Sequence, residues 1–391
     1  MEFIKENDTL LICLNGRVDS SNAEATEAEL KQLRAENPHE KLVLDAEELE
    51  YISSAGLRII LRLRKEEPTL NIINASAEVY DIFDMTGFTE MLPIAKAYRR
   101  LSVEGCQVIG GGANGKVYRF DPDTIIKVYF NPDSLPDIQR ERDLARKAFV
   151  LGIPTAISYD VVKVGEGYGS VFELLNAKLL SELMMEEPDK LDYYVGIYVD
   201  LMKKLHSTEV TPGDMPDMKQ VALNWVSFLK DYLPEEQYNK IYDMVSAVPQ
   251  DNHMLHGDYH VKNVMMQNGE ALLIDMDTLC LGNPVFEFAS IYQAYLGFSE
   301  LDHGTTTRFL GIPWEMAEQI WQKSLRLYFG ADDEQALAAY ADKARVICYV
   351  RMMRREIRRN GFEREDGRAF IAHCQKKLEE LLGRVDSLIF E

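Results

Sequence analysis

The feature that most constrains this chain is a pair of polar motifs separated by a short apolar stretch. The first motif is HGDYHVKN at residues 256–263, and the second is IDMD at residues 274–277, directly after Leu272 and Leu273. An Asp and an Asn in one tight loop, followed by an Asp at the end of a β-like run, are the groups that phosphoryl transfer from a nucleotide requires. One carboxylate orients the attacking hydroxyl, and two oxygen ligands hold Mg2+. The chain should therefore also contain a lobe that binds phosphates.

A glycine-rich segment earlier in the chain has the spacing of a phosphate-binding loop. Gly110, Gly112 and Gly115 fit the pattern G-x-G-x-x-G-x-V between two alternating apolar runs, which predict a β-hairpin. Such a loop can place backbone N–H groups over the phosphates of a nucleotide. Alone the pattern is weak, because a glycine-rich hairpin is more often only a turn.

The next expected strand, residues 124–129, carries Lys127 in an apolar, β-branched stretch. An unpaired ammonium would be costly there, and a triphosphate would be a natural partner. Beyond Pro136, the sequence predicts a helix whose Glu141 would pair with Lys127, with Asp143 as the neighbouring candidate. Each of these signals also has a purely structural interpretation, such as a lysine whose side chain only extends to solvent. Their order along the chain is the order that a two-lobed kinase needs, and this favours the functional interpretation.

Together these residues resemble the aminoglycoside phosphotransferase and choline kinase superfamily, whose catalytic loop is typically H-G-D-x-H-x-x-N and whose metal-binding turn is typically I-D-x-x. The resemblance covers roughly residues 101–391. It implies an α+β, protein-kinase-like fold with an antiparallel N-terminal lobe at 105–175, a hinge and a helical C-terminal lobe at 176–391. The chain departs from the family pattern at Val261-Lys262, where Pro-Gly is common, and at Asn283 and Glu287, where Asp is more usual. These departures concern substrate preference more than catalysis.

The resemblance also implies the roles of the motif residues. Asp258 would be the catalytic Asp, with His256 bracing its loop as a second catalytic candidate. Asn263 and Asp275 would bind Mg2+, and Asp277 would be an accessory ligand.

For the nucleotide, the resemblance implies that Lys127, oriented by Glu141, contacts the phosphates of ATP beneath the glycine-rich loop. Residues 171–175 look like the hinge strand, whose edge would offer the backbone of Glu173 and Leu175 to adenine.

The first hundred residues predict a different domain. Short strands at residues 9–16 and 42–45 alternate with helices, as in a small α/β domain. The string YISSAGLR at residues 51–58 closely resembles the signature of the STAS domain, which is found in bacterial anti-sigma-factor antagonists. We therefore expect a STAS-like domain at 1–98, a linker at 99–104 and the kinase-like domain at 105–391.

In the STAS family, a serine at the start of a helix is the phosphoacceptor of a partner kinase, and the matching position here is Ser54. A phosphate there would lie against backbone N–H groups at the positive end of a helix dipole. Ser53 and Ser54 are also what a helix N-cap requires, and Ser53 stands where the family often has Asp. A phosphorylation switch and a plain cap both stay open, and the resemblance implies a protein partner for this domain.

Composition and net charge argue against several classes of binding partner and metal site. The net charge of -21 argues against nucleic-acid or anionic-membrane binding, since the electrostatic term would be repulsive. Five scattered cysteines predict reduced thiols, with neither a zinc site nor a disulfide framework. No run approaches the roughly 18 apolar residues that a membrane span needs. We therefore expect a cytoplasmic and, from the STAS resemblance, bacterial protein.

The helical lobe holds two groups of residues of open function. One face of an expected helix carries arginines at helical spacing, at positions 351, 354, 355 and 358, and another arginine follows at 359. The default interpretation is a solvated helix face whose arginines pair with glutamates. The alternative is a surface that docks an acidic partner or substrate. Five aromatic residues could line an acceptor pocket, although each is more often part of a core: Trp225, Tyr232, Trp314, Trp321 and Tyr349.

The sequence thus predicts an ATP- and Mg2+-dependent phosphotransferase that transfers the γ-phosphate to a hydroxyl of a small molecule. Asp258 would accept a hydrogen bond from that hydroxyl and take its proton late. Two alternatives stay open. One is a nucleotide-sensing regulatory protein of the anti-sigma-factor-antagonist type. The other is a serine kinase acting on Ser54, which Gly257 makes less favoured because protein kinases usually carry Arg there.

Overall fold

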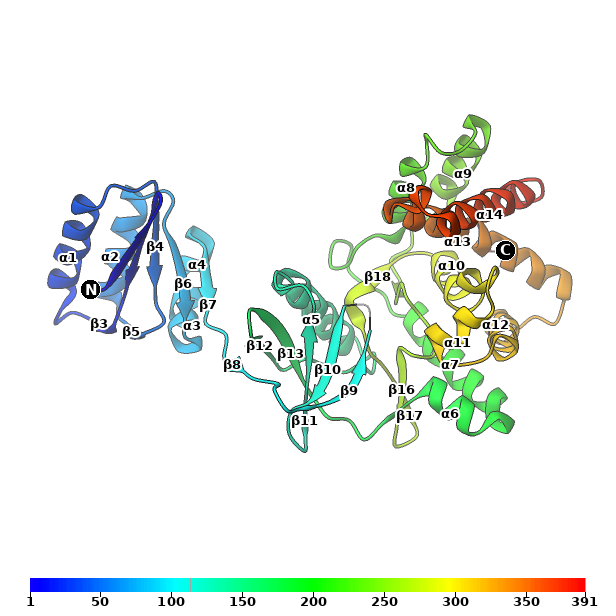
Figure 1. Cartoon of the computed structure of the whole chain (residues 1–391), viewed down its shortest axis with the longest axis horizontal. Helices are drawn as coiled ribbons and strands as arrows, with labels where there is room; N and C mark the ends of the chain where they lie inside the picture. Colours follow the sequence, from blue (N-terminus) through cyan, green and yellow to red (C-terminus); the bar gives the residue numbers. More distant parts are fainter. Residues whose placement is uncertain (113, 391) are drawn as a thin grey trace. The chain divides into compact units, whose positions relative to one another are not determined.

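The computed structural model describes residues 1–112 and 114–390. Contacts between Cα atoms divide the chain into two compact units, Met1–Ser102 with Val161–Glu166, and Val103–Asp160 with Gly167 onward. Figure 1 shows the course of the chain through its helices and strands. Ala113 of the predicted glycine-rich loop and Glu391, the expected end of the kinase-like domain, lie outside the described residues.

The first unit is built on a five-stranded sheet in which β1 and β2 are antiparallel and the other neighbours are parallel. Alternate residues of the central strands, such as Leu10, Ile12, Leu42 and Leu44, are fully buried, as expected for strands with one face on a core. In sheet order the strands are β1 (Phe3–Glu6), β2 (Thr9–Cys13), β4 (Lys41–Asp45), β6 (Asn71–Ala75) and β7 (Ile94–Lys96), and a separate parallel pair is formed by β3 (Gly16–Val18) and β5 (Leu49–Ile52).

Four helices complete this unit: α1 (Ala23–Glu36), α2 (Ser54–Glu66), α3 (Ala77–Met85) and α4 (Phe88–Met91). Figure 1 shows α1 and α2 side by side, and the two helices are in contact. Along α2, Leu57, Ile60 and Leu63 recur every three residues and are buried, which is the pattern of a helix with one apolar face. The expected small α/β domain is confirmed.

The second unit begins with strands that lie in the order β13 (Gly167–Glu173), β11 (Thr124–Tyr129), β10 (Gly115–Arg119) and β9 (Gln107–Gly111). The parallel pair β8 (Arg100–Leu101) and β12 (Asp160–Val164) falls, apart from Asp160, in the first unit. The predicted hairpin around the glycine-rich loop is formed by β9 and β10, and β11 and β13 continue it in antiparallel fashion. The strand before the loop begins at Gln107, because a turn with Gly105 at φ 79° and a hydrogen bond from Cys106 N to Val103 O precedes it. Helix α5 (Leu135–Val150) packs against β13 and contains the expected Glu141.

The rest of the second unit is mainly helical, as Figure 1 shows from green to red. Helix α10 (Pro284–Tyr295) lies at the centre of its core, since every residue from Val285 to Tyr295 is buried. The other helices are α6 (Leu180–Glu186), α7 (Leu191–His206), α8 (Met218–Phe228), α9 (Glu235–Ala247), α11 (Gly304–Leu310), α12 (Trp314–Phe329), α13 (Glu334–Arg358) and α14 (Glu365–Leu382).

Short elements connect these helices. The 3-10 turns are η1 (Pro188–Lys190), η2 (Met276–Thr278), η3 (Gly297–Ser299) and η4 (Gly361–Glu363). The strands are β14 (Lys178–Leu179), β16 (Val264–Gln267) and β17 (Glu270–Leu273) in one small sheet, and β15 (Met254–Leu255) with β18 (Cys280–Leu281) in another. The predicted α+β class, with a sheet-rich region followed by a helical part, is confirmed. Among the described residues, no helix combines the length and the apolar character that crossing a membrane would need.

Candidate active site

Lys127 on β11 lies between two carboxylates that are distant in sequence. Its Nζ is 3.1 Å from Oε1 of Glu141 and 2.7 Å from Oδ1 of Asp275. The Tyr129 hydroxyl donates to Oε2 of Glu141 at 2.8 Å and so helps to hold that carboxylate. Burial lowers the pKa of Lys127, but Glu141 and Asp275 outweigh this effect and hold the pKa above its ordinary value. The structure therefore brings together the strand lysine, the helix glutamate and the first Asp of the IDMD motif.

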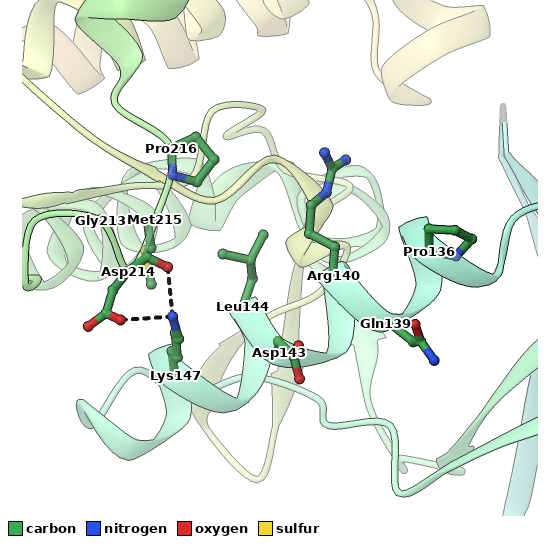
Figure 2. A pocket seen from close by; sticks show the side chains of 10 residues that line it. All are labelled: Pro136, Gln139, Arg140, Asp143, Leu144, Lys147, Gly213, Asp214, Met215 and Pro216. Carbon is green, nitrogen blue, oxygen red and sulfur yellow. Dashed lines mark hydrogen bonds and ion pairs between the residues drawn. The ribbon is translucent and has the colours of Figure 1, made fainter. Parts of the chain in front are cut away.

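Asp143, the second candidate partner for Lys127, lies on another side of α5. Two residues along a helix correspond to a rotation of roughly 200°. Asp143 is exposed and lines a surface hollow between α5 and the loop at residues 213–216 (Figure 2). The hollow is bridged by Lys147, whose Nζ is 3.0 Å from Oδ1 of Asp214. Neither Lys127 nor Asp258 lines this hollow, so it is separate from the predicted site.

Gly257 allows the backbone conformation that the HGD motif adopts. Its φ of 80° lies in the left-handed region, and a Cβ there would stand 2.5 Å from the carbonyl oxygen of Thr278. The Gly257 carbonyl accepts hydrogen bonds from Ser290 Oγ at 2.9 Å and from Arg351 Nη1 at 3.2 Å. No side chain fits at this position, which accounts for a glycine where protein kinases usually carry Arg.

Glu287 on α10 holds the same loop from beneath. Its carboxylate is fully buried and accepts the backbone N–H of His256 at 2.5 Å and that of Gly257 at 3.0 Å. His206 on α7 places Nε2 3.6 Å from the same carboxylate. Sequence reasoning noted Glu287 only as a departure from the family pattern and missed this role. The available signal was a lone charge inside an apolar helical run, because such a residue is rarely buried without partners.

His256 itself is buried and joins the catalytic loop to the strand before the metal-binding turn. Its Nε2 lies 3.2 Å from the carbonyl oxygen of Ile274. The backbone carbonyl of His256 accepts from Thr278 Oγ1 at 2.8 Å. These contacts suit a bracing role for His256, and they make it a positioning residue more than one that touches substrate.

Asp258 presents a partly exposed carboxylate, with 35% of its side-chain surface accessible. His260 Nε2 lies 3.6 Å from Oδ2. Burial alone would raise the pKa of Asp258, but His260, Arg351 and His256 lower it to about 2. The carboxylate is therefore ionised at neutral pH and able to accept a hydrogen bond from a hydroxyl group.

Asn263 is tied to the same loop by both its backbone and its side chain. Its N–H donates to the His260 carbonyl at 2.8 Å, and Nδ2 donates to the Asp258 carbonyl at 2.9 Å. Its own carbonyl accepts from Ile274 N at 3.0 Å. These contacts commit the amide nitrogen to the loop, so that Oδ1 is the Asn263 atom with ligand chemistry.

The turn at residues 274–277, which is predicted to bind a metal ion, concentrates negative charge. Asp275 adopts φ 61° and ψ 62°, a left-handed conformation that is uncommon for residues other than glycine and clusters at functional sites. Burial, followed by the charges of Asp275 and Glu141, raises the pKa of Asp277 to about 7. Crowded carboxylates of this kind are relieved by a divalent cation.

The donor set fits Mg2+. Asp275, Asp277 and Asn263 offer only oxygen ligands, which Mg2+ prefers. No group of three His, Cys, Asp or Glu side chains with metal-binding geometry is found in the described part of the chain. Mg2+ is usually held by one or two carboxylates together with substrate phosphates, so two carboxylates and one amide match that mode.

The three predicted glycines of the phosphate-binding loop have different surroundings. A Cβ at Gly115 would stand 2.3 Å from the Val128 carbonyl oxygen, so close strand packing requires glycine there. A Cβ at Gly110 would come no nearer than 3.8 Å to another atom, and one at Gly112 would meet nothing within 4 Å. Asn114 Nδ2 lies 3.5 Å from Oδ2 of Asp277, so the loop reaches the metal-binding turn.

The expected hinge begins at the end of a strand. Strand β13 lies beside β11 in the sheet and ends at Glu173. Glu173 pairs with Thr124 in the ladder, and the N–H of Leu174 donates to the Asp123 carbonyl at 2.7 Å. Leu175 follows beyond the strand, where the chain leaves the sheet.

The arginines of the helical lobe differ from the default expectation, whereas three of the five aromatic residues agree with it. Within the described residues, no ion pair to a carboxylate is formed by the arginines at 351, 354, 355, 358 and 359, so the expectation of a glutamate-paired face is wrong. Trp225, Trp321 and Tyr349 are buried in the core, Tyr232 is exposed, and Trp314 stacks on His303 with ring centres 3.9 Å apart.

In the first unit, the two candidate serines take separate positions. Ser53 is the N-cap of α2, and its Oγ accepts from Ala55 N at 3.2 Å. Ser54 is the first residue of the helix and is exposed. The capping function therefore belongs to Ser53, which leaves the Ser54 hydroxyl at the surface.

Comparison with known families agrees with this division of the chain. Residues 105–318 match the model of the phosphotransferase enzyme family, and residues 1–101 match the model of the STAS domain. The protein BtrV of Bordetella bronchiseptica, provisionally named an anti-sigma factor antagonist, is 37% identical over 97 residues, which are 24% of this chain and 83% of BtrV.

Solved structures of two other proteins are similar to this chain at low sequence identity. A choline/ethanolamine kinase family protein from Mesorhizobium loti is 14% identical, with a TM-score of 0.47, over 71% of this chain and 87% of its own. The ADP-bound aminoglycoside phosphotransferase APH(2'')-Ib is 16% identical, with a TM-score of 0.46, over 80% and 98%. From the family models and the bacterial relative, this chain belongs to the phosphotransferase enzyme family and carries a STAS domain at its N-terminal end.

Proposed function

We propose that this chain transfers the γ-phosphoryl group of ATP, with Mg2+, to a hydroxyl group of a small molecule. The observation that carries the proposal is the convergence of Lys127, Glu141 and Asp275 at 2.7 to 3.1 Å. A lysine suited to binding phosphates and an aspartate suited to holding a metal ion therefore lie next to each other, which supports the proposal. Membership of the phosphotransferase enzyme family supports the same reaction class.

In the proposed reaction, Asp258 positions the acceptor. Its ionised carboxylate accepts a hydrogen bond from the acceptor hydroxyl. The bond between the γ-phosphorus and the β,γ-bridging oxygen breaks as a bond from the acceptor oxygen to that phosphorus forms, and the hydroxyl proton passes to Asp258. The products are ADP and a phosphate monoester. Because the transition state is loose, positioning contributes more than early deprotonation.

Asp275, Asp277 and the Asn263 amide oxygen would hold Mg2+, which would neutralise charge on the phosphates. Lys127 would keep Glu141 as its partner and donate its remaining N–H bonds to the phosphates, and Asp275 would then be available to hold the metal.

The test is a transfer assay with ATP labelled at the γ-phosphate, Mg2+ and a panel of sugars, amino alcohols, hydroxy acids and aminoglycosides. Label should appear on a small molecule and should fall at least about a thousandfold in Asp258→Ala, with ATP binding nearly unchanged. Near-normal turnover by Asp258→Ala would refute the assignment. Nucleotide bound but never consumed would favour a nucleotide-sensing regulatory protein instead.

A second function is favoured by the exposed Ser54. We propose that the STAS domain binds a protein partner and that phosphorylation of Ser54 at the start of α2 controls this binding. In the same assay, label on the protein that is lost in Ser54→Ala and kept in Ser53→Ala would support it. Label that survives in both variants would exclude Ser54 as the acceptor.

The five cysteines are free thiols, which supports placing these activities in the cytoplasm.

A further inference from the structure

One face of α13 carries arginines without carboxylate partners, although the chain as a whole has a net charge of -21. We call Arg351, Arg354 and Arg355 the arginine face. No described residue forms an ion pair with any of the three, and the one carboxylate in their stretch, Glu356, is bound by Arg364. The Nε of Arg354 is buried and has no hydrogen-bond partner among the described residues. In a chain with 64 acidic residues, this unpaired group needs a chemical explanation.

The arginine face lies beside the catalytic carboxylate. Arg351 Nη1 donates to the Gly257 carbonyl at 3.2 Å, one residue from Asp258. Arg351 also contributes, after His260, to lowering the pKa of Asp258, and the charge of Asp258 acts in turn on Arg355. An acceptor whose hydroxyl meets Asp258 therefore has the guanidinium groups of Arg351 and Arg355 near its other substituents, and Arg354 adjoins them on the same helix.

Aromatic rings support the same three guanidinium groups. Arg351 lies 5.2 Å from the ring centre of Trp225, Arg354 lies 5.7 Å from that of Phe228, and Arg355 lies 4.8 Å from that of Phe298. Such stacking uses the flat face of a guanidinium and leaves its N–H edge for other partners.

The arginines also repel one another. Burial first, and then Arg358 and Arg351, hold the pKa of Arg354 below its ordinary value, and burial and Arg359 do the same for Arg355. A bound anion would relieve this repulsion and satisfy the free N–H groups.

We propose that the arginine face binds an anionic group of the acceptor, so that the substrate is a hydroxyl compound carrying a phosphate or a carboxylate. A guanidinium can hold either group through two parallel hydrogen bonds, whereas a cationic acceptor would be repelled. This proposal rests on the proposed phosphotransferase function and adds the class of substrate to it. The reaction is unchanged: the acceptor hydroxyl gains the γ-phosphoryl group and loses its proton to Asp258, and ADP leaves.

The test measures acceptor binding apart from turnover. The full chain is first saturated with Mg2+ and the non-hydrolysable analogue adenylyl imidodiphosphate, which fills the nucleotide site. Glycerol 3-phosphate, D-glycerate, glycerol and choline are then titrated separately by calorimetry. Failure of the nucleotide analogue to bind would count against the proposed function itself, whereas the acceptor titrations test the arginine face.

The expected result is binding of glycerol 3-phosphate or D-glycerate and none of glycerol or choline. Arg355→Gln should weaken binding of the anion about tenfold or more, with the nucleotide analogue still bound as in wild type. Arg355→Lys should recover part of the lost affinity for the anion. Lysine keeps the positive charge, but it lacks the planar guanidinium that can donate two parallel hydrogen bonds. Arg146→Gln, at an exposed position on α5, removes the same charge as a matched control and should bind as wild type.

Results of two kinds would overturn the proposal. The first kind concerns the wild type: choline or glycerol binds as tightly as the two anions or more tightly, or neither anion binds. The other is an unchanged dissociation constant in both Arg355→Gln and Arg354→Gln, which would mean that the arginines only pack on the aromatic rings. Melting temperatures of all variants are measured alongside. Arg355 is expected to tolerate substitution, because the residue is exposed at the surface even though neighbouring groups partly desolvate its guanidinium.

Discussion

The catalytic loop and the glycine-rich loop of this phosphotransferase are built in opposite ways. The backbone around Gly257 is held by Glu287, Ser290 and Arg351, all from helices distant in sequence. The glycine-rich hairpin is exposed along the whole of β9, and the tip around Gly112 has open space above it. The proposed function accounts for this difference. In the proposed reaction, the carboxylate that receives a proton would have to be held in place beforehand, whereas the nucleotide would have to enter and leave beneath its loop.

The largest effect should come from removing the carboxylate beneath the catalytic loop. Glu287→Ala leaves two buried backbone N–H groups without an acceptor, which should reduce the free energy of unfolding by roughly 2–6 kcal/mol. Displacement of Asp258 should also lower kcat by roughly a hundredfold. Denaturant unfolding and the transfer assay measure the two effects. Glu318→Ala, at an exposed site on α12, is the control, and equal stability of the two variants would contradict the bracing role.

A smaller loss is expected from Gly257→Ala, because the new Cβ meets the Thr278 carbonyl and the backbone has φ 80°. Strain and overlap together should cost roughly 2–5 kcal/mol of unfolding free energy. Gly269→Ala separates the two causes, since Gly269 has φ 86° but nothing within 4 Å of its added Cβ. That variant should lose only about 1–2 kcal/mol. Equal losses in the two variants would remove the role assigned to the Thr278 contact.

Asp277→Asn should stabilise the metal-free protein, and the gain should depend on pH. The pKa of Asp277 is raised to about 7 from an ordinary value of 3.8. The folded state then binds more protons than the unfolded state between these values, so the wild type loses stability as pH rises through that window. The Asn variant should melt roughly 2–4 °C higher above pH 7 in EDTA, with the gain disappearing towards pH 4. With added Mg2+, the wild type should melt at a higher temperature than the Asn variant. A gain in melting temperature that does not vary with pH would contradict the raised pKa assigned to Asp277.

The smallest effect is expected at the tip of the glycine-rich hairpin. Gly112→Ala should change the unfolding free energy by no more than about 0.5 kcal/mol, because its Cβ meets no atom within 4 Å. Any effect should appear in the KM for ATP. Gly115→Ala is the matched comparison, since its Cβ overlaps the Val128 carbonyl, and it should be clearly less stable. Similar stability of the two variants would contradict the difference drawn between these glycines.

The parts of the site that could be predicted from sequence are those in which spacing along the chain already implies position. Lys127 on a strand and Glu141 one helix later come together because a strand followed by a packed helix leaves few arrangements. The HGD and IDMD motifs define their own loop and turn through short local spacing. The two STAS serines could not be separated, because both are good caps and only the backbone geometry assigns the cap to Ser53.

The prediction that was wrong depended on which elements are neighbours. The arginines of α13 were expected to pair with glutamates, as a solvated helix usually does, but this face packs on aromatic rings of α8 and η3 instead. Periodicity shows which residues share a helix face, and it does not show what that face meets.

By itself, the sequence determined which chemical groups are present and in what order, because motif spacing is a local property of the covalent chain. It was sufficient for the family, for the two domains and for the candidate roles of Asp258, Asn263 and Asp275. Only the tertiary structure decided that Glu287 holds the backbone of His256, 31 residues away, and that Arg351 reaches Gly257, 94 residues away. Contacts over such separations are set by how helices pack against the catalytic loop, and no local pattern encodes that packing.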